Sequence, residues 1–344
     1  MLTCTRTERV TRLRWSENRG FERPHGVPEG SVLSVFRVPP EVAGQRLDIF
    51  LQTQLKRTSR TRAQFIVRAS AYDDSGRRLR PGSRVLAHQL VLLWRPPWDE
   101  TPVPTDVAIL YEDEHLLAVD KPPKLPVHPT ARYHKNTLIK VLQRARPDQF
   151  LSLGHRLDRE TSGVLLVAKT AECDRALKRD LENRAGIEKI YVAITWGAPV
   201  AKGETLRVDK PLELDPTSKT KVKMRVGMQL AASTIFRGVD ATEDYGLVRC
   251  ELLTGRQHQI RVHLASLGTP IVGDKLYGID ETYFTREADG VLDEDAAADL
   301  EMPRQALHAA ELRLAHPITR RPLEVLAPLP DDMRGFWSTV RGTP

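Results

Sequence analysis

A polar loop in the middle of the chain holds the residues best suited to chemistry. The string Gly154-His-Arg-Leu-Asp-Arg-Glu-Thr-Ser-Gly163 places Asp158 between Arg156 and Arg159 and leads into the apolar segment 164–168. Because neighbouring cations favour the charged form of a carboxyl group, Asp158 is expected to stay ionised and can serve as a nucleophile or an electrostatic stabiliser. A structural ion pair fits the same spacing, and on spacing alone it is the better explanation.

The chain lacks the common motifs for cofactors and metals. It has no GxGxxG or GxxxxGK loop, no HExxH, no GxSxG and no metal-spaced set of cysteines and histidines. Cys4, Cys173 and Cys250 lie far apart, so we expect reduced thiols. His258 and His263 lack the spacing of a metal site with an open position, which favours core or supporting roles for both. We therefore expect neither a metal nor an organic cofactor.

The loop resembles the signature of the RluA-type pseudouridine synthases, in which His-Arg-Leu-Asp is followed by two variable residues and then Thr-Ser-Gly. Other segments match the same family in the same order along residues 105–330. These segments are 110–123, 127–129, 188–193, 254–264, 270–278, 307–309 and 316–317. The resemblance implies an α+β protein with the pseudouridine synthase fold, a mixed and mostly antiparallel sheet divided by a basic cleft with the catalytic aspartate in its middle.

The resemblance also implies a catalytic set. Asp158 matches the aspartate proposed to attack the anomeric carbon of the target uridine or to assist cleavage of its glycosidic bond, after which the uracil rotates and rejoins through carbon 5. Arg261 matches the arginine that pairs with this aspartate, which would fix its orientation and keep its pKa low. Tyr191 matches the aromatic residue that stacks on the target base; a half-buried strand tyrosine is the alternative.

Four further residues are candidates for binding the RNA substrate: Arg156, His155, Lys189 and Arg256. The target uridine has to leave its helix or loop, and Arg156 matches the family residue that fills the vacated place. His155 either contacts the base or stabilises the loop, and the structural role is favoured. Lys189, next to Tyr191, is expected to orient a phosphate or the motif itself.

The surrounding sequence predicts strands with interspersed helices and no strict alternation of the two, which indicates an α+β domain. We expect a hairpin over 107–120, helices over 137–144 and 171–184, and strands over 161–168, 187–196 and 233–253. Arg261 is placed on a strand. A further strand over 219–226 would carry Lys219, Lys221, Lys223 and Arg225 on one face, where they either follow phosphates or protect a sheet edge.

Three regions are expected along the chain. Residues 1–30 read as a flexible tail, and the proline-rich segment 96–104 as a connector. Between them, residues 31–98 form a small α/β module that resembles the RNA-binding module of ribosomal protein S-four type; an N-terminal extension of the main domain is the alternative. We expect it to contain near-helical spacing over 41–55, a helix over 61–69 and a strand over 84–93. Residues 99–344 form the catalytic domain.

The charge distribution favours a polyanionic partner. The 344-residue chain carries a formal net charge of +7, and ten Lys or Arg residues between Lys56 and Arg95 stand against only Asp73 and Asp74. We expect this basic block to face nucleic acid. In contrast, the segment 280–301 holds nine acidic residues and one arginine. This acidic insertion, 280–302, is expected to be a solvated loop away from the nucleic acid.

Together these features predict an RNA pseudouridine synthase that acts through Asp158 on structured RNA, either large-subunit ribosomal RNA or transfer RNA. We expect a monomer. We also expect it in the cytoplasm, because the chain has no apolar run long enough for a membrane span and no secretory signal. Two alternatives stay open. One is a non-catalytic RNA-binding or ribosome-assembly protein of the same fold, and the other is an RNA glycosidase that cleaves without rejoining the base.

Overall fold

The computed structural model describes residues 20–55, 58–97, 99–130, 132–183, 186–220 and 222–342. The chain forms two compact units that meet in the sequence between Asp99 and Glu100, and each unit is described by itself. Residues 1–19 of the expected tail lie outside the described residues. The expectation of a flexible tail is wrong for the part that follows, because Val27 is buried and packs with Phe21 against the first strands.

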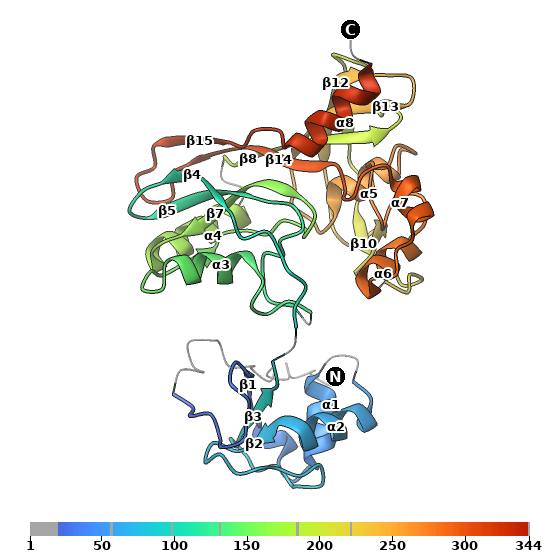
Figure 1. The fold of residues 1–344 in the computed structure, drawn as a ribbon. Helices are drawn as coiled ribbons and strands as arrows, with labels where there is room; N and C mark the ends of the chain where they lie inside the picture. Colours follow the sequence, from blue (N-terminus) through green and yellow to red (C-terminus); the bar gives the residue numbers. More distant parts are fainter. Residues whose placement is uncertain are drawn as a thin grey trace, which may run out of the picture. The chain divides into compact units, whose positions relative to one another are not determined.

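The N-terminal unit is a small three-stranded sheet with two helices on it (Figure 1). The strands β1 (Val32–Arg37), β3 (Leu90–Arg95) and β2 (Ala71–Tyr72) pair antiparallel in that order. A 3-10 turn (Pro40–Val42) precedes helices α1 (Leu47–Gln54) and α2 (Arg60–Ser70), whose apolar faces pack on β1 and β3. The strand expected over 84–93 is wrong at its start. A turn that contains His88, in the left-handed conformation, separates residues 84–86 from β3, which begins at Leu90.

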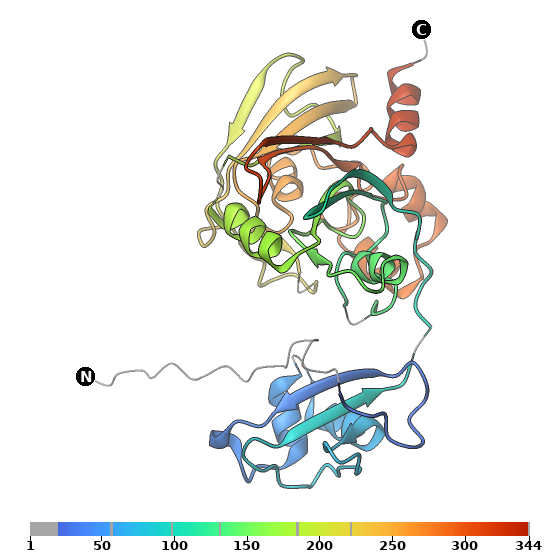
Figure 2. The same ribbon diagram turned by 90° about the vertical axis from the view of Figure 1, so that its left-hand side faces the viewer.

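The C-terminal unit is built on one ten-stranded mixed sheet, mostly antiparallel as expected (Figures 1 and 2). Its main path runs β4-β5-β7-β14-β8-β13-β12-β9, with β6 on β7 and β15 on β14. The strands are β4 (Ala108–Glu112), β5 (Leu116–Lys121), β6 (Ser152–Leu153), β7 (Ser162–Ala168), β8 (Glu188–Trp196), β9 (Thr205–Val208), β12 (Thr234–Ala241), β13 (Tyr245–Leu252), β14 (Leu307–Ala315) and β15 (Pro322–Leu326). A separate hairpin joins β10 (Leu212–Leu214) to β11 (Met224–Val226).

Helices cover both faces of the β5–β7 half of this sheet. On one face α3 (Leu138–Ala145) joins the main core, and on the other face α4 (Ala171–Asn183) packs through Cys173 and Leu177. All seven residues of β7 are buried as a result. This explains why its sequence is continuously apolar rather than alternating. Helices α5 (Gln259–Ala265) and α8 (Asp331–Arg341) join the main core at the other half of the sheet, α5 next to β12 and α8 through Phe336 on Tyr245 of β13.

The sheet is joined across its middle by very little backbone pairing. Strand β7 pairs with β14 only through Ser162 and Gly163, opposite His308 and Ala309, and this is the sheet's parallel contact. Gly163 has φ of +109°, and a Cβ built there would lie 2.2 Å from the carbonyl oxygen of Ala309. Only glycine fits this close approach. The loop that carries Asp158 therefore enters the sheet at a fixed place, beside the start of β14.

Two expectations about local structure are wrong. Arg261 lies on helix α5 and not on a strand. Every residue from Gln259 to Leu264 is buried, so the apolar pattern of this segment does not show the one-sided period by which a surface helix is recognised. Regular strand in the segment 219–226 covers only Met224–Val226, and Lys221 lies outside the described residues.

Two of the four cations expected on one face of that segment form ion pairs, which does not favour the phosphate-binding role for them. Lys223 pairs with Glu281, and Arg225 pairs with Glu213. Their charges are therefore balanced locally instead of being presented together to a polyanion.

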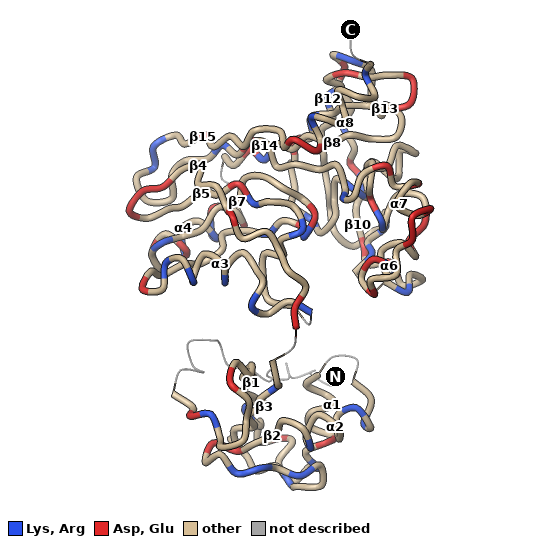
Figure 3. Tube along the Cα trace, viewed as in Figure 1, with Lys and Arg blue, Asp and Glu red and all other residues tan. Residues whose placement is uncertain are grey.

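The acidic insertion is folded, which corrects the expectation of a solvated loop. It forms α6 (Thr282–Asp289) and α7 (Glu294–Leu300), and these helices enclose a small core of Tyr283, Leu292, Ala296 and Leu300. Figure 3 marks acidic residues in red at several places along this part of the Cα trace. No helix among the described residues is long and apolar enough to cross a membrane.

Candidate active site

A pocket of about 320 Å³ lies around Asp158. The loop before β7, strand β8, the end of β13, the start of α5 and Leu307 of β14 contribute its walls. Its basic lining residues are Arg156, Lys189, Arg256 and Arg261, and Asp158 is its sole acidic one. The pocket is therefore strongly cationic around a single carboxylate, an arrangement that suits an anionic substrate with a reacting centre at Asp158.

Asp158 and Arg261 are in direct contact. Nη1 of Arg261 donates a hydrogen bond of 2.9 Å to Oδ2 of Asp158, whose side chain keeps 23% of its surface exposed. Burial raises the pKa of the Asp158 carboxyl, but the charge and hydrogen bond of Arg261 and the charge of Arg156 outweigh burial and bring the pKa below its ordinary value. Asp158 is thus ionised and fixed on one side, with Oδ1 left for other contacts.

Arg261 is itself held from behind by Asp274. Its Nε and Nη2 donate bonds of 2.7 and 2.8 Å to the two oxygens of Asp274, which is fully buried and also accepts the backbone N–H groups of Leu276 and Tyr277. This two-point pairing fixes the guanidinium plane. Asp274 belongs to the 270–278 segment of the family resemblance, but a role for it was missed because the sequence does not show which arginine it meets.

Tyr191 and Lys189 point to the same face of β8 and line the pocket. Tyr191 is 8% exposed, and burial raises the pKa of its phenol well above the ordinary value. It therefore stays a neutral donor and apolar ring, not a phenolate. Burial lowers the pKa of Lys189 to about 8. On the opposite face of β8, a second pocket of about 430 Å³ is lined by Glu188 and Ile190 together with mixed charges.

The other expected substrate-binding residues also reach the pocket, but in different ways. Arg156 is exposed, and no hydrogen bond or ion pair of its side chain is found among the described residues. Arg256 is partly committed, because its Nε donates 3.0 Å to the carbonyl oxygen of Ala231. Nε2 of His155 accepts the backbone N–H of Leu166 at 3.2 Å, so this ring anchors the loop onto β7. This hydrogen bond to Leu166 is the contact that the structural role favoured for His155 would need.

Four charged side chains form a ring that connects the loop carrying Asp158, residues 154–163, to the acidic insertion. Arg159 pairs with Glu287 of α6 at 2.8 Å and with Glu160 at 3.1 Å, while Lys275 pairs with Glu160 at 3.0 Å and with Glu287 at 3.4 Å. Arg159 and Glu160 follow Asp158, and Lys275 follows Asp274. The insertion thus contacts the residues that follow Asp158 and Asp274, while its expected position away from the nucleic acid stays a prediction.

Lys121 is a second support that the sequence reading missed. Its fully buried ammonium donates to the carbonyl oxygens of Pro122, Leu125 and Arg159 at 2.8, 3.0 and 3.1 Å. Arg159 is the residue after Asp158, so this contact holds the backbone of the loop that carries Asp158. Lys121 belongs to the 110–123 segment of the resemblance. It is the last residue of an apolar strand, where a lysine is usually expected to be exposed to solvent.

Buried neutral histidines should make the stability of this unit depend on pH. Burial lowers the pKa of His155 to about 3 and that of His308 to about 4. Unfolded histidine titrates near 6.5, so unfolding at pH 5 takes up protons and is favoured. The free energy of unfolding, from urea denaturation, should be greatest above about pH 6.5 and fall towards pH 4. An unchanged value between pH 7.5 and pH 5 would contradict the burial of these rings as neutral groups.

No group of three or more His, Cys, Asp or Glu side chains placed to hold a metal ion is present in the described ranges. What the arrangement can do chemically follows from its oriented carboxylate. An ionised Asp158 beside a neutral phenol and several cations can stabilise or attack an electron-poor carbon of a substrate whose phosphates are bound around it.

Comparisons with known proteins give the family of this chain. Residues 115–266 match the model of the family described as RNA pseudouridylate synthase. "Ribosomal large subunit pseudouridine synthase D" of Xanthomonas campestris is 34% identical over 91% of this chain and 94% of its own length. The protein of the same name from Pseudomonas aeruginosa is 34% identical over 88% and 94%. The structure of human RNA pseudouridylate synthase domain containing 4 covers 66% of this chain and 90% of its own, with 26% identity and a TM-score of 0.50.

Proposed function

We propose, from the premise that this chain belongs to the RNA pseudouridylate synthase family, that its substrate is ribosomal RNA of the large subunit. As a member of that family the chain is an isomerase that converts uridine to pseudouridine in RNA. The names of relatives that align over nearly their whole length support the large subunit over transfer RNA. The observation that carries the catalytic part of the proposal is the Asp158–Arg261 contact inside a cationic pocket.

In this proposal Asp158 acts on the ribose of the target uridine. Arg261 holds Oδ2, so Oδ1 is the oxygen available to attack the anomeric carbon or to stabilise positive charge there as the bond to nitrogen 1 of the base breaks. Both forms of this step need an ionised carboxylate. The lowered pKa of Asp158, caused by the cations that outweigh its burial, supports that state at neutral pH.

The base has to rotate and rejoin without leaving the pocket. The ring of Tyr191 is suited to stack on the freed uracil, because it is buried on one side and lines the pocket on the other. Carbon 5 then bonds to the anomeric carbon, loses its proton, and nitrogen 1 gains one. The reaction is an internal transfer that balances without an oxidant or reductant, which agrees with the expectation that no cofactor is needed.

The surrounding cations would bind the RNA around the extruded nucleotide. Arg156 is exposed at the pocket and is suited to fill the place that the uridine leaves in its stack. Lys189 and Arg256 line the same pocket and can contact phosphates. Every residue proposed for this site comes from one chain, so a monomer is sufficient for it. For ribosomal RNA as substrate we expect the reaction to take place in the cytoplasm.

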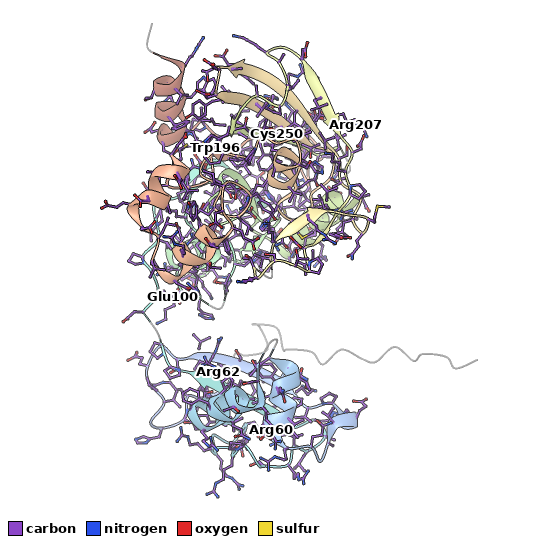
Figure 4. The ribbon with its side chains drawn as sticks, turned by 90° about the vertical axis from the view of Figure 1, so that its right-hand side faces the viewer. Arg60, Arg62, Glu100, Trp196, Arg207 and Cys250 are labelled. Atoms are coloured by element: carbon purple, nitrogen blue, oxygen red, sulfur yellow. The ribbon has the colours of Figure 1, made fainter. Side chains whose placement is uncertain are left out.

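We infer that the N-terminal unit docks RNA in the manner of an S-four-type module. Helix α2 exposes Arg62 and Arg68 with the ring of Phe65, which is 63% exposed and lies 5.9 Å from the Arg62 guanidinium. Cations contact phosphates and exposed aromatic rings stack on unpaired bases, so this helix face is suited to RNA. Figure 4 labels Arg62 and also Arg60, whose charge is partly used by buried Asp48.

Removing the N-terminal unit should separate docking from chemistry. Deletion of residues 1–99 leaves every proposed active-site residue, so kcat should change by less than about twofold, whereas KM on full-length RNA should rise. Binding should also depend less steeply on salt, by roughly one unit of slope per lost phosphate contact. The full-length variant with Arg62→Gln and Arg68→Gln is the matched control for charge alone. Unchanged KM and salt slope in both proteins would show that this unit does not dock RNA.

The proposed substrate and reaction are tested together with purified protein and two RNAs. Large-subunit ribosomal RNA should gain pseudouridine and release no free uracil, while an equal amount of transfer RNA should gain none. Release of uracil would identify an RNA glycosidase instead. Modification of transfer RNA alone would overturn the proposed substrate, and modification of neither RNA would favour the non-catalytic alternative.

A further inference from the structure

His258 lies between the catalytic carboxylate and a second tyrosine and has an uncommon backbone conformation. Its φ and ψ are 55° and 20°, in the left-handed region that residues other than glycine seldom adopt. No other pocket-lining residue, all of them within the described ranges, has a left-handed φ. Such strain persists where the surrounding structure fixes it and is concentrated at functional sites. The contacts of the His258 side chain therefore need an explanation.

The contacts of Tyr277 determine which ring nitrogen of His258 carries the proton. The hydroxyl oxygen of Tyr277 accepts the backbone N–H of Met224 at 2.8 Å and lies 2.8 Å from Nδ1 of His258. No other partner for the phenol proton is found among the described residues, so the phenol donates to Nδ1. A neutral imidazole that accepts at Nδ1 is protonated at Nε2. Burial and the nearby Arg261 lower the pKa of His258 to about 4, which keeps the ring neutral.

The protonated Nε2 faces the reactive side of Asp158. It lies 3.8 Å from Oδ1, while Arg261 occupies Oδ2 at 2.9 Å. Hydrogen bonds of catalytic groups are often long without substrate and shorten in the complex. A contraction of somewhat less than about 1 Å would bring Nε2 and Oδ1 to normal hydrogen-bond distance. The two oxygens of the carboxylate then have different and defined donors.

We propose that His258 is a positioning residue, held by Tyr277 as the Nε2–H tautomer, which donates to Oδ1 of Asp158 and sets the rotation of this carboxylate towards the ribose. The inference rests on the proposed role of Asp158. A neutral donor suits this place better than another cation, because it orients the oxygen without cancelling the negative charge that the reaction needs. Tyr277 acts one step further away, by fixing the tautomer.

Substitutions at both residues test this chain of contacts. Tyr277→Phe removes the proton donated to Nδ1, so kcat should fall about 10- to 100-fold with KM within about threefold of wild type. His258→Asn keeps a side chain that tolerates the left-handed backbone but cannot reach Asp158, and it should lose a similar factor. His258→Gln can still donate through its longer amide and should recover most of the loss. A merely structural role would not distinguish Asn from Gln in this direction.

A measurement on the wild-type protein does not depend on whether the variants fold. Nitrogen NMR of protein labelled in its histidines should show His258 as the Nε2–H tautomer at pH 7, with the signal assigned by its loss in His258→Asn. An Nδ1–H tautomer, or a kcat of Tyr277→Phe equal to that of an active wild type, would overturn this inference alone. A folded wild type that forms no pseudouridine would instead overturn the proposed function, while the tautomer would still be measurable.

Discussion

Replacing Asp158 with asparagine should abolish turnover and leave RNA affinity within about tenfold of the wild type. Asparagine has nearly the same size, and its amide oxygen can still accept the bond from Arg261, but it has neither the negative charge nor the nucleophilic oxygen. Affinity rests on many phosphate contacts and the chemistry on one carboxylate, so the two properties should separate. Release of tritium from carbon 5 of labelled uridine measures turnover, and filter binding measures affinity.

Asp209→Asn is the matched control for this experiment. Asp209 lies in an exposed pair with Arg207, so the same chemical change there should alter neither turnover nor affinity by more than about twofold. Activity of Asp158→Asn above about a hundredth of the wild-type rate would remove Asp158 from the catalytic role. A loss of affinity as large as the loss of turnover would point to a disturbed RNA-binding surface instead.

The second large effect is expected at Arg261, and it concerns stability as well as rate. Arg261→Met leaves Asp274 ionised, fully buried and without its cation. Removal of one partner from a buried pair typically costs about 3–5 kcal/mol, and the same loss in the free energy of unfolding is expected here. Turnover should also fall to background, because Oδ2 of Asp158 loses its donor. Urea denaturation and tritium release measure the two effects.

A double variant separates the stability effect from the catalytic one. Asp274→Asn in the Arg261→Met background removes the stranded charge, so it should restore much of the stability and none of the activity. The control Arg207→Met, at a residue labelled in Figure 4, breaks the exposed ion pair with Asp209 and should cost less than about 1 kcal/mol. Recovery of turnover in the double variant would show that Arg261 is needed for folding alone.

The sequence predicts those parts of the site that depend on local order along the chain. The loop from Gly154 to Gly163 and the apolar strand after it can be predicted from the sequence, because a polar turn before a buried strand has a distinct composition. The family resemblance adds which of these residues are expected to be catalytic. It could not supply the distance between Asp158 and Arg261, which are 103 residues apart in sequence.

The errors have a common physical cause, which is tertiary context. The sequence predicts a strand where helix α5 lies, because the residues Gln259 to Leu264 are all buried and their apolar pattern therefore shows no helical period. The sequence predicts a solvated loop for the acidic insertion because nine of its residues are acidic. Tyr283 and Leu300 nevertheless form a small core, and Glu287 finds two cations from distant segments. Long-range ion pairs of this kind leave no local signal in a single sequence.

The most direct test of the central claim is made on cellular RNA. Cells that lack this protein are complemented with the wild-type chain or with Asp158→Asn, and pseudouridines are mapped by carbodiimide-dependent stops of reverse transcription. We predict stops at defined uridines of large-subunit ribosomal RNA that disappear without the protein, return with the wild type and stay absent with Asp158→Asn. Identical stops in all three strains, or their return with Asp158→Asn, would contradict the claim that this chain isomerises those uridines through Asp158.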